Sequence, residues 1–92
     1  MEISKMLTIS TAHITEETAR LLDIEPSNND MWLSIYNKAE FGWFIYVHKN
    51  LDDRNIPDDL RKCLEFAKEN DCEWLCLDCA ADVVDELDEY EW

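Results

Sequence analysis

The stretch PDDLRKCLEFAKENDCEWLCL, residues 57–77, decides the fold because a helical and a strand periodicity follow each other within it. Its apolar residues first recur at i, i+3, i+4 and i+7, namely Leu60, Cys63, Leu64 and Ala67. Pro57 suits the first turn of a helix, and the two aspartates after it lie near the positive end of the helix dipole. Residues 72–77 then alternate as a strand does. The stretch therefore predicts a helix followed directly by a strand.

The chain before this stretch predicts a strand, a helix and a hairpin. Met6 to Ser10 has β-branched character, and Thr15, followed by two glutamates, predicts the N-cap of a helix from Glu16 to Leu22 or just beyond. Two aromatic and β-branched runs, Met31–Tyr36 and Phe41–His48, are separated by four residues, a length suited to an antiparallel hairpin. Both faces of the second run are apolar, which predicts a central strand covered by helix on at least one side.

The remaining segments complete the predicted topology. Glu25–Asp30 and Lys49–Asn55 have the composition of connecting loops, and Val83 and Val84 suggest a last short strand. Ninety-two residues suit one domain, residues 1–92. We expect a single small α+β domain of β-α-β-β-α-β order, with a mainly antiparallel sheet and two helices packed on one face.

Acidic residues dominate the surface chemistry of the C-terminal quarter. The net charge is −14, and residues 69–92 carry ten of the twenty-two acidic residues and no Lys or Arg. Trp, Leu, Val and Cys interleave with the charges, which favours a folded acidic surface over a disordered tail. In strand geometry, carboxylates two residues apart lie roughly 6.6 Å from each other on one face. Successive phosphates of a nucleic-acid strand have a similar spacing.

This charge makes the C-terminal quarter the candidate partner-binding site. Direct binding of DNA or RNA is disfavoured, because nucleic-acid affinity depends on Lys and Arg. A basic partner is favoured, and proteins that hold nucleic acid are the commonest basic proteins. The candidate partner-binding residues are Glu69, Asp71, Glu73, Asp78, Asp82, Asp85, Glu86, Asp88, Glu89 and Glu91.

Export and membrane insertion are not indicated by the sequence. Met1 to Met6 lacks the apolar core of a signal peptide, and the longest apolar run, Phe41 to Val47, is too short to span a bilayer. We expect a cytoplasmic protein, in which cysteine thiols stay reduced.

The four cysteines are expected to be packed core thiols. Cys63 lies on the apolar stripe of its helix, and Cys72 and Cys76 flank Trp74 on one strand face. Zinc remains an alternative, but Cys76-x-x-Cys79 is the only pair with the usual knuckle spacing. A redox pair is a further alternative. The sequence therefore predicts no cofactor and no metal.

No catalytic motif accompanies the two histidines. His13 and His48 lie thirty-five residues apart, at the start of a helix and the end of a strand, with no nucleophile motif near either. A Cys–His pair assembled in space is the alternative. We therefore predict that the protein is not an enzyme.

Calcium is a further alternative for the acidic residues. Carboxylate oxygens between Asp78 and Glu89 are of the kind that calcium takes. The stretch lacks the Asp-x-Asp-x-Asp-Gly pattern and has no glycine for the sharp turn. Specific calcium binding is therefore not expected.

Five segments carry a resemblance to known proteins, and they span nearly the whole chain. ISTAHITEETARLLD (9–23), GWFIYV (42–47), IPDDLRKCL (56–64), CEWLCLD (72–78) and YEW (90–92) resemble a small uncharacterised family of bacterial and mobile-element proteins. An acidic, phage-associated chain of this kind also resembles the anti-CRISPR proteins that act on the type I-C surveillance complex. The chain departs from the family pattern around residues 79–88, where acidic residues stand in place of a Gly- and Pro-containing turn.

Charge and resemblance together predict an acidic DNA mimic. Such an inhibitor would occupy the DNA-recognition site of a type I-C complex and block target DNA recognition, with exposed Tyr90 or Trp92 as an anchor. The alternative is an accessory or antitoxin-like interaction module that binds a basic partner without imitating DNA.

Overall fold

The computed structural model describes residues 1–24, 31, 33–51 and 55–92. The elements, in chain order, are β1 (Met6–Ser10), the 3-10 turn η1 (Thr11–His13), α1 (Glu16–Asp23), β2 (Ile35–Lys38), β3 (Gly42–Tyr46), α2 (Asp58–Glu69) and β4 (Trp74–Asp78). This is the predicted β-α-β-β-α-β order, and the chain is a single α+β domain. The expected loop Glu25–Asp30 and part of the Lys49–Asn55 connection lie outside the described residues.

Four strands form one mixed sheet in the order β1-β4-β3-β2. The edge strand β1 pairs parallel to β4, whereas β4 with β3 and β3 with β2 pair antiparallel. The predicted central position of β3 is confirmed. Gly42 begins this strand at a φ of +157°, and a Cβ there would lie 1.7 Å from the carbonyl oxygen of Leu77. Only glycine lets β3 approach β4 this closely.

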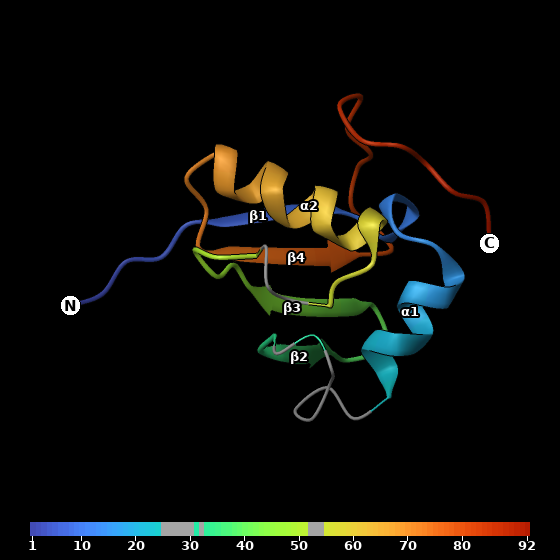
Figure 1. The fold of residues 1–92 in the computed structure, drawn as a ribbon, viewed down its shortest axis with the longest axis horizontal. Helices are drawn as coiled ribbons and strands as arrows, with labels where there is room; N and C mark the ends of the chain where they lie inside the picture. The colour runs from blue at the N-terminus through green and yellow to red at the C-terminus, as the bar shows by residue number, and fades with distance from the viewer. Residues whose placement is uncertain (25–30, 32, 52–54) are drawn as a thin grey trace.

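α2 packs on one face of the sheet, as the sequence predicts, and α1 lies beside the ends of β1 and β4 and joins the same core (Figure 1). On that face, Ile45, Leu75 and Leu77 are fully buried. The predicted α2 stripe supplies the opposing core, and Ala19 and Leu22 of α1 join the same core. The apolar pattern of 57–77 therefore forms the centre of the domain.

The two helices are also joined through one carboxylate. Asp59 of α2 accepts the backbone N–H of Thr15 at 2.7 Å and the hydroxyl of Thr18 at 2.9 Å. Thr15 is the N-cap of α1, because its own hydroxyl accepts the N–H of Thr18. The predicted start of α1 is confirmed, and the helix ends one residue past Leu22.

The hairpin strands are shorter than predicted and shifted. β2 begins at Ile35 and continues through Lys38, which pairs with Gly42. The turn is therefore 39–41, closed by a hydrogen bond from Phe41 N–H to the Lys38 carbonyl at 2.9 Å. Ala39 takes a φ of +47° in this turn. Polar residues that looked like loop in the sequence belong to the strand because the tight turn needs only three residues.

No helix in the described part of the chain covers the second face of the sheet. Rings gather there, with Trp74 5.3 Å from Tyr46 and 6.0 Å from Tyr36 between ring centroids. His48 makes an edge contact with Tyr46 at 5.1 Å. The face is therefore rich in aromatic rings and partly exposed, which agrees with the two-sided apolar pattern of β3.

The expected last strand at Val83 and Val84 is wrong. These residues belong to an irregular segment, and Val84 donates its N–H to a histidine ring rather than to a strand. Half-buried Val84 packs against the core without being part of a strand. Among the described residues, no helix has the length and apolar character needed to cross a membrane.

Candidate functional site

The last fourteen residues, Cys79–Trp92, form an irregular segment that returns along η1 to the start of α1 (Figure 1). We call it the C-terminal segment. Backbone hydrogen bonds hold it at both ends: Ser10 N–H donates to the Asp82 carbonyl at 3.1 Å, and Tyr90 N–H donates to the Ala12 carbonyl at 2.8 Å. The Trp92 indole N–H donates to the Ile14 carbonyl at 2.8 Å. The acidic end of the chain is thus attached to the folded domain.

His13 fixes the middle of the C-terminal segment. Its ring is 2% exposed, and its Nε2 accepts the backbone N–H of Val84 at 2.9 Å. Nε2 therefore carries no proton, so Nδ1 carries it and donates to the Asp88 carbonyl at 2.8 Å. One buried ring thus closes the loop between Val84 and Asp88. Nothing local in the sequence signalled this role, since the partners lie 71 and 75 residues away.

The predicted partner-binding residues fall into three groups. Asp82, Asp85, Glu86, Asp88, Glu89 and Glu91 are all exposed on the C-terminal segment. Glu69 ends α2, and Asp71 and Glu73 follow in the turn before β4. Asp78 ends β4. Only Asp78 lies in a strand, so the expected strand-like, phosphate-like spacing of the carboxylates is wrong. The segment follows η1 through isolated hydrogen bonds and never forms a ladder.

The C-terminal segment and α2 bring several of these acids together. Glu86 and Leu87 line a shallow hollow of about 260 Å³ with Lys62, Glu65, Phe66 and Glu69 of α2. Glu69 and Glu86 therefore share one surface, and Glu65, which sequence reasoning did not select, joins them. Lys62 approaches Asp88 at 3.8 Å, but both side chains are exposed and such a pair contributes little.

Asp78 is set apart from the other acids by an ion pair. Lys38 Nζ lies 2.5 Å from Asp78 Oδ2 across the sheet. The hydrogen bond from Lys38, and then the one from the Ala80 N–H, lowers the pKa of the Asp78 carboxyl. The same hydrogen bond raises the pKa of Lys38. The charge of Asp78 is thus balanced within the protein.

Asp71 and Glu73 lie at the opposite end of β4 from the C-terminal segment. Glu73 accepts the backbone N–H of Lys5 at 2.5 Å, just before β1 begins. Lys5 also donates through Nζ to the Asn70 carbonyl at 2.8 Å. Neither of these two acids lines the hollow that Glu69 and Glu86 share.

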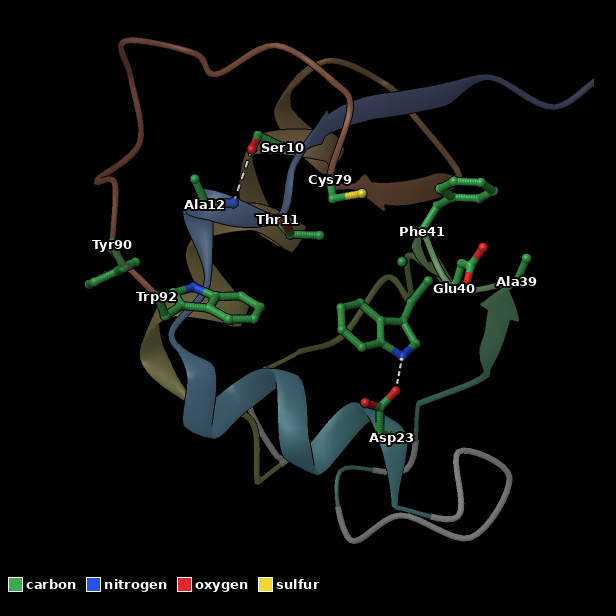
Figure 2. Close-up of a pocket in the computed structure, with 12 residues that line it drawn as sticks. Ser10, Thr11, Ala12, Asp23, Ala39, Glu40, Phe41, Cys79, Tyr90 and Trp92 are labelled. Carbon is green, nitrogen blue, oxygen red and sulfur yellow. Dashed lines mark hydrogen bonds between the residues drawn. The ribbon is translucent and has the colours of Figure 1, made fainter.

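A larger hollow of about 650 Å³ lies where β1 and β4 end, between the C-terminal segment, the hairpin turn and the end of α1 (Figure 2). We call it the carboxyl-end pocket. The indole N–H of Trp43 donates to Asp23 Oδ1 at 3.0 Å on its wall. Its lining comprises Ser10, Thr11, Ala12, Asp23, Ala39, Glu40, Phe41, Gly42, Trp43, Cys79, Tyr90 and Trp92. Sequence reasoning selected none of these except the two terminal aromatic residues.

The cysteines are placed partly as expected. Cys63, Cys72 and Cys76 are buried, but Cys79 is exposed, so the expectation of a packed thiol is wrong there. β4 ends at Asp78, which leaves Cys79 in the following turn. Burial, with a smaller effect of the Asp59 charge, raises the pKa of the Cys63 thiol to about 12.

The positions of the cysteine and histidine side chains bear on the two alternatives, a metal site and a Cys–His pair. Within residues 1–24, 31, 33–51 and 55–92, no three His, Cys, Asp or Glu side chains gather as metal ligands do. Cys63 contacts His13 through Sγ and the backbone carbonyl, at 3.6 Å, and not through the ring. Both ring nitrogens of His13 are engaged by backbone groups.

Comparison with known proteins places the chain in a family. No curated protein and no solved structure matches it. A family model, described as the C-terminal domain of a family of unknown function (DUF5983), matches residues 6–92. The match begins with the first residue of β1 and extends through the C-terminal segment to Trp92. The protein therefore belongs to the DUF5983 family, through the C-terminal domain of that family.

Proposed function

We propose that this protein is a non-enzymatic inhibitor whose acidic surface occupies the nucleic-acid-binding site of a basic partner. The observation that supports this most is the attachment of the C-terminal segment to η1 through His13. Six exposed carboxylates are thereby held on a folded scaffold, and one of them, Glu86, lies beside Glu65 and Glu69 of α2. We call this set of carboxylates the acidic surface.

The acidic surface is costly to hold together, which favours a function that uses it. Two unit charges about 7 Å apart in water repel by roughly 0.6 kcal/mol before salt screening. Solubility alone needs far less than a net charge of −14. Within the described residues, three ion pairs form, and of the six carboxylates on the segment only Asp88 takes part in one. The remaining charge is available to a cationic partner.

The partner that the sequence resemblance suggests is the DNA-recognition subunit of a type I-C CRISPR surveillance complex, in the cytoplasm of the infected cell if the protein is phage-encoded. A Lys- and Arg-lined DNA site would attract the acidic surface over a long range. Because the carboxylates do not follow strand spacing, the imitation of DNA rests on charge density rather than on a repeat that matches phosphates. Binding is therefore competitive and sensitive to salt.

The second candidate function is an accessory or antitoxin-like module that binds a basic protein without imitating DNA. The carboxyl-end pocket favours it, because a pocket with aromatic walls is suited to hold a side chain of a partner protein. Such a pocket is not needed to imitate the phosphates of DNA. Association that is insensitive to salt would support this second function.

A DNA displacement assay tests the proposal. Purified type I-C complex, bound to fluorescently labelled target DNA, is titrated with the protein to saturation. Displacement is expected, with weaker displacement by the Glu86→Lys, Glu89→Lys double variant. The Glu2→Lys, Ile3→Lys, Ser4→Lys triple variant changes the net charge equally but in the exposed N-terminal run before β1, and should displace DNA as the wild type does. If the complex keeps its target DNA when it is saturated with the protein, the DNA-mimic proposal is wrong.

A further inference from the structure

The carboxyl-end pocket has the composition of a site for an organic cation. Its volume, about 650 Å³, suits a side chain or small molecule. Four aromatic residues contribute to its walls, from two distant parts of the chain: Phe41 and Trp43, and Tyr90 and Trp92. Figure 2 shows the Trp92 ring reaching in from the chain end, with Asp23 and Phe41 on the other sides of the hollow. Aromatic walls attract cations through the negative face of the ring.

Both indole N–H groups of the pocket are already used within the protein. Trp92 donates to the Ile14 carbonyl, and Trp43 donates to Asp23 Oδ1. Neither ring therefore offers a guest a donor, and the exposed ring of Trp92 offers its π surface, whereas Trp43 is mostly buried in the wall. A guest that needs hydrogen-bond acceptors finds them instead in the carboxylates of Asp23 and Glu40.

The electrostatics of the pocket favour positive charge. Among the described residues that line it, two are acidic and none is basic. Asp23 is the last residue of α1, at the negative end of the helix dipole. The nearby cation of α1, Arg20, pairs with Glu16 at 2.6 Å one turn back and does not pair with Asp23. In the part of the chain that the structure describes, Asp23 Oδ2 and the Glu40 carboxylate accept no hydrogen bond.

We propose that the carboxyl-end pocket binds the guanidinium of an arginine side chain presented by a partner protein. A planar guanidinium can stack on an indole while its in-plane N–H groups donate to carboxylates, which a compact, strongly hydrated lysine ammonium does less well. This proposal rests on the basic partner that both candidate functions share, and it names the side chain through which that partner is anchored. It requires no imitation of DNA.

The test uses the isolated protein and small probes. N-acetyl-arginine methylamide is titrated into labelled protein while the indole N–H resonances of Trp43 and Trp92 are followed by NMR. The neutral isostere N-acetyl-citrulline methylamide and the lysine derivative serve as comparison probes. Alkylation of Cys79, the exposed thiol on the pocket wall, provides a second readout, because a bound guest should slow it.

Two variants separate the pocket from general charge attraction. Asp23→Asn keeps an oxygen that accepts the Trp43 N–H but removes the charge, and Asp85→Asn makes the same change of net charge on the C-terminal segment, outside the pocket lining. We expect saturable shifts of both indole resonances with the arginine probe, and about tenfold weaker binding by Asp23→Asn, the size of effect expected for one charge-assisted hydrogen bond. Asp85→Asn should bind the arginine probe as the wild type does.

Several outcomes would overturn the proposal. Equal binding of the citrulline probe would show that charge is not recognised, and equal binding of the lysine probe would remove the assignment to guanidinium. If Asp85→Asn weakens binding of the arginine probe as much as Asp23→Asn does, the binding reflects nonspecific charge attraction and not the pocket. Because these probes contain a single residue, a failure here leaves the DNA displacement result unchanged. Failure of displacement likewise leaves arginine binding intact.

Discussion

Replacing His13 with alanine should release the C-terminal segment while the sheet and both helices stay folded. The substitution removes the acceptor of the Val84 N–H and the donor to the Asp88 carbonyl, at 2.9 and 2.8 Å. Each such bond contributes roughly 0.5–1.5 kcal/mol. The loss of two bonds, at about 2–3 kcal/mol with loss of ring packing included, corresponds to roughly a 30- to 160-fold rise in the open population of the segment.

Amide hydrogen exchange measured by NMR resolves this effect residue by residue. In the wild type, the N–H groups of Val84 and Tyr90 are bonded to His13 and to the Ala12 carbonyl. We expect their protection to fall by roughly 30- to 160-fold in the variant, as local opening becomes easier. The dispersed amide spectrum of β4 should persist, because its ladders to β1 and β3 are untouched.

His48→Ala is the matched control, since it removes the other histidine. His48 lies beyond the end of β3, on the second face of the sheet beside Tyr46, and far along the chain from the segment. Its substitution should leave the exchange of Val84 and Tyr90 unchanged. If these two amides keep their protection in His13→Ala, or lose it equally in His48→Ala, then His13 does not hold the segment.

Three further predictions concern the ion pair, the thiols and the glycine. Because the folded pKa of Asp78 is lowered, its pairing with Lys38 stabilises the protein above pH 3.8, the ordinary value, and this contribution is lost as pH falls through the lower folded value. Urea unfolding should therefore show Lys38→Met less stable than wild type at pH 7 and equally stable well below pH 3.8; a pH-independent difference would contradict the pairing. Iodoacetamide at pH 7 should modify native Cys79 rapidly and buried Cys63 only after unfolding, as mass spectrometry would show, and fast native labelling of Cys63 would argue against its burial. Gly42→Ala should cost about 3 kcal/mol or more in urea unfolding, because its Cβ would meet a backbone oxygen at 1.7 Å, and a cost below about 1 kcal/mol would refute that close approach.

Local patterns predicted most of the fold. Thr15 and Pro57 mark the starts of the two helices because capping and first-turn preferences act within a few residues. The apolar stripe of α2 predicted which face of that helix is buried, since its periodicity follows from helix geometry. The observed hairpin boundaries differ from the predicted ones because the length of the turn depends on which residues pair across it. Amino-acid composition does not determine that register.

The candidate sites were harder to predict because they are assembled from distant segments. The carboxyl-end pocket needs Asp23, Trp43 and Trp92 to meet, and no local pattern marks any of them as a wall residue. His13 holds the C-terminal segment through groups more than seventy residues away. The error at Val84 has the same origin. Its β-branched character predicts a strand only where an edge can pair with it, and here a histidine ring takes that hydrogen bond.

The most direct test of the central claim is the salt dependence of association with the type I-C complex, measured by stopped flow for wild type and for the Glu86→Lys, Glu89→Lys double variant. If the acidic surface docks in a cationic nucleic-acid site, the wild-type association rate constant should fall at least about tenfold between roughly 50 and 500 mM salt. The double variant should associate slowly with a much flatter dependence, and the Glu2→Lys, Ile3→Lys, Ser4→Lys control should follow the wild type. A wild-type rate constant that does not change with salt, or one that the double variant reproduces, would contradict the account.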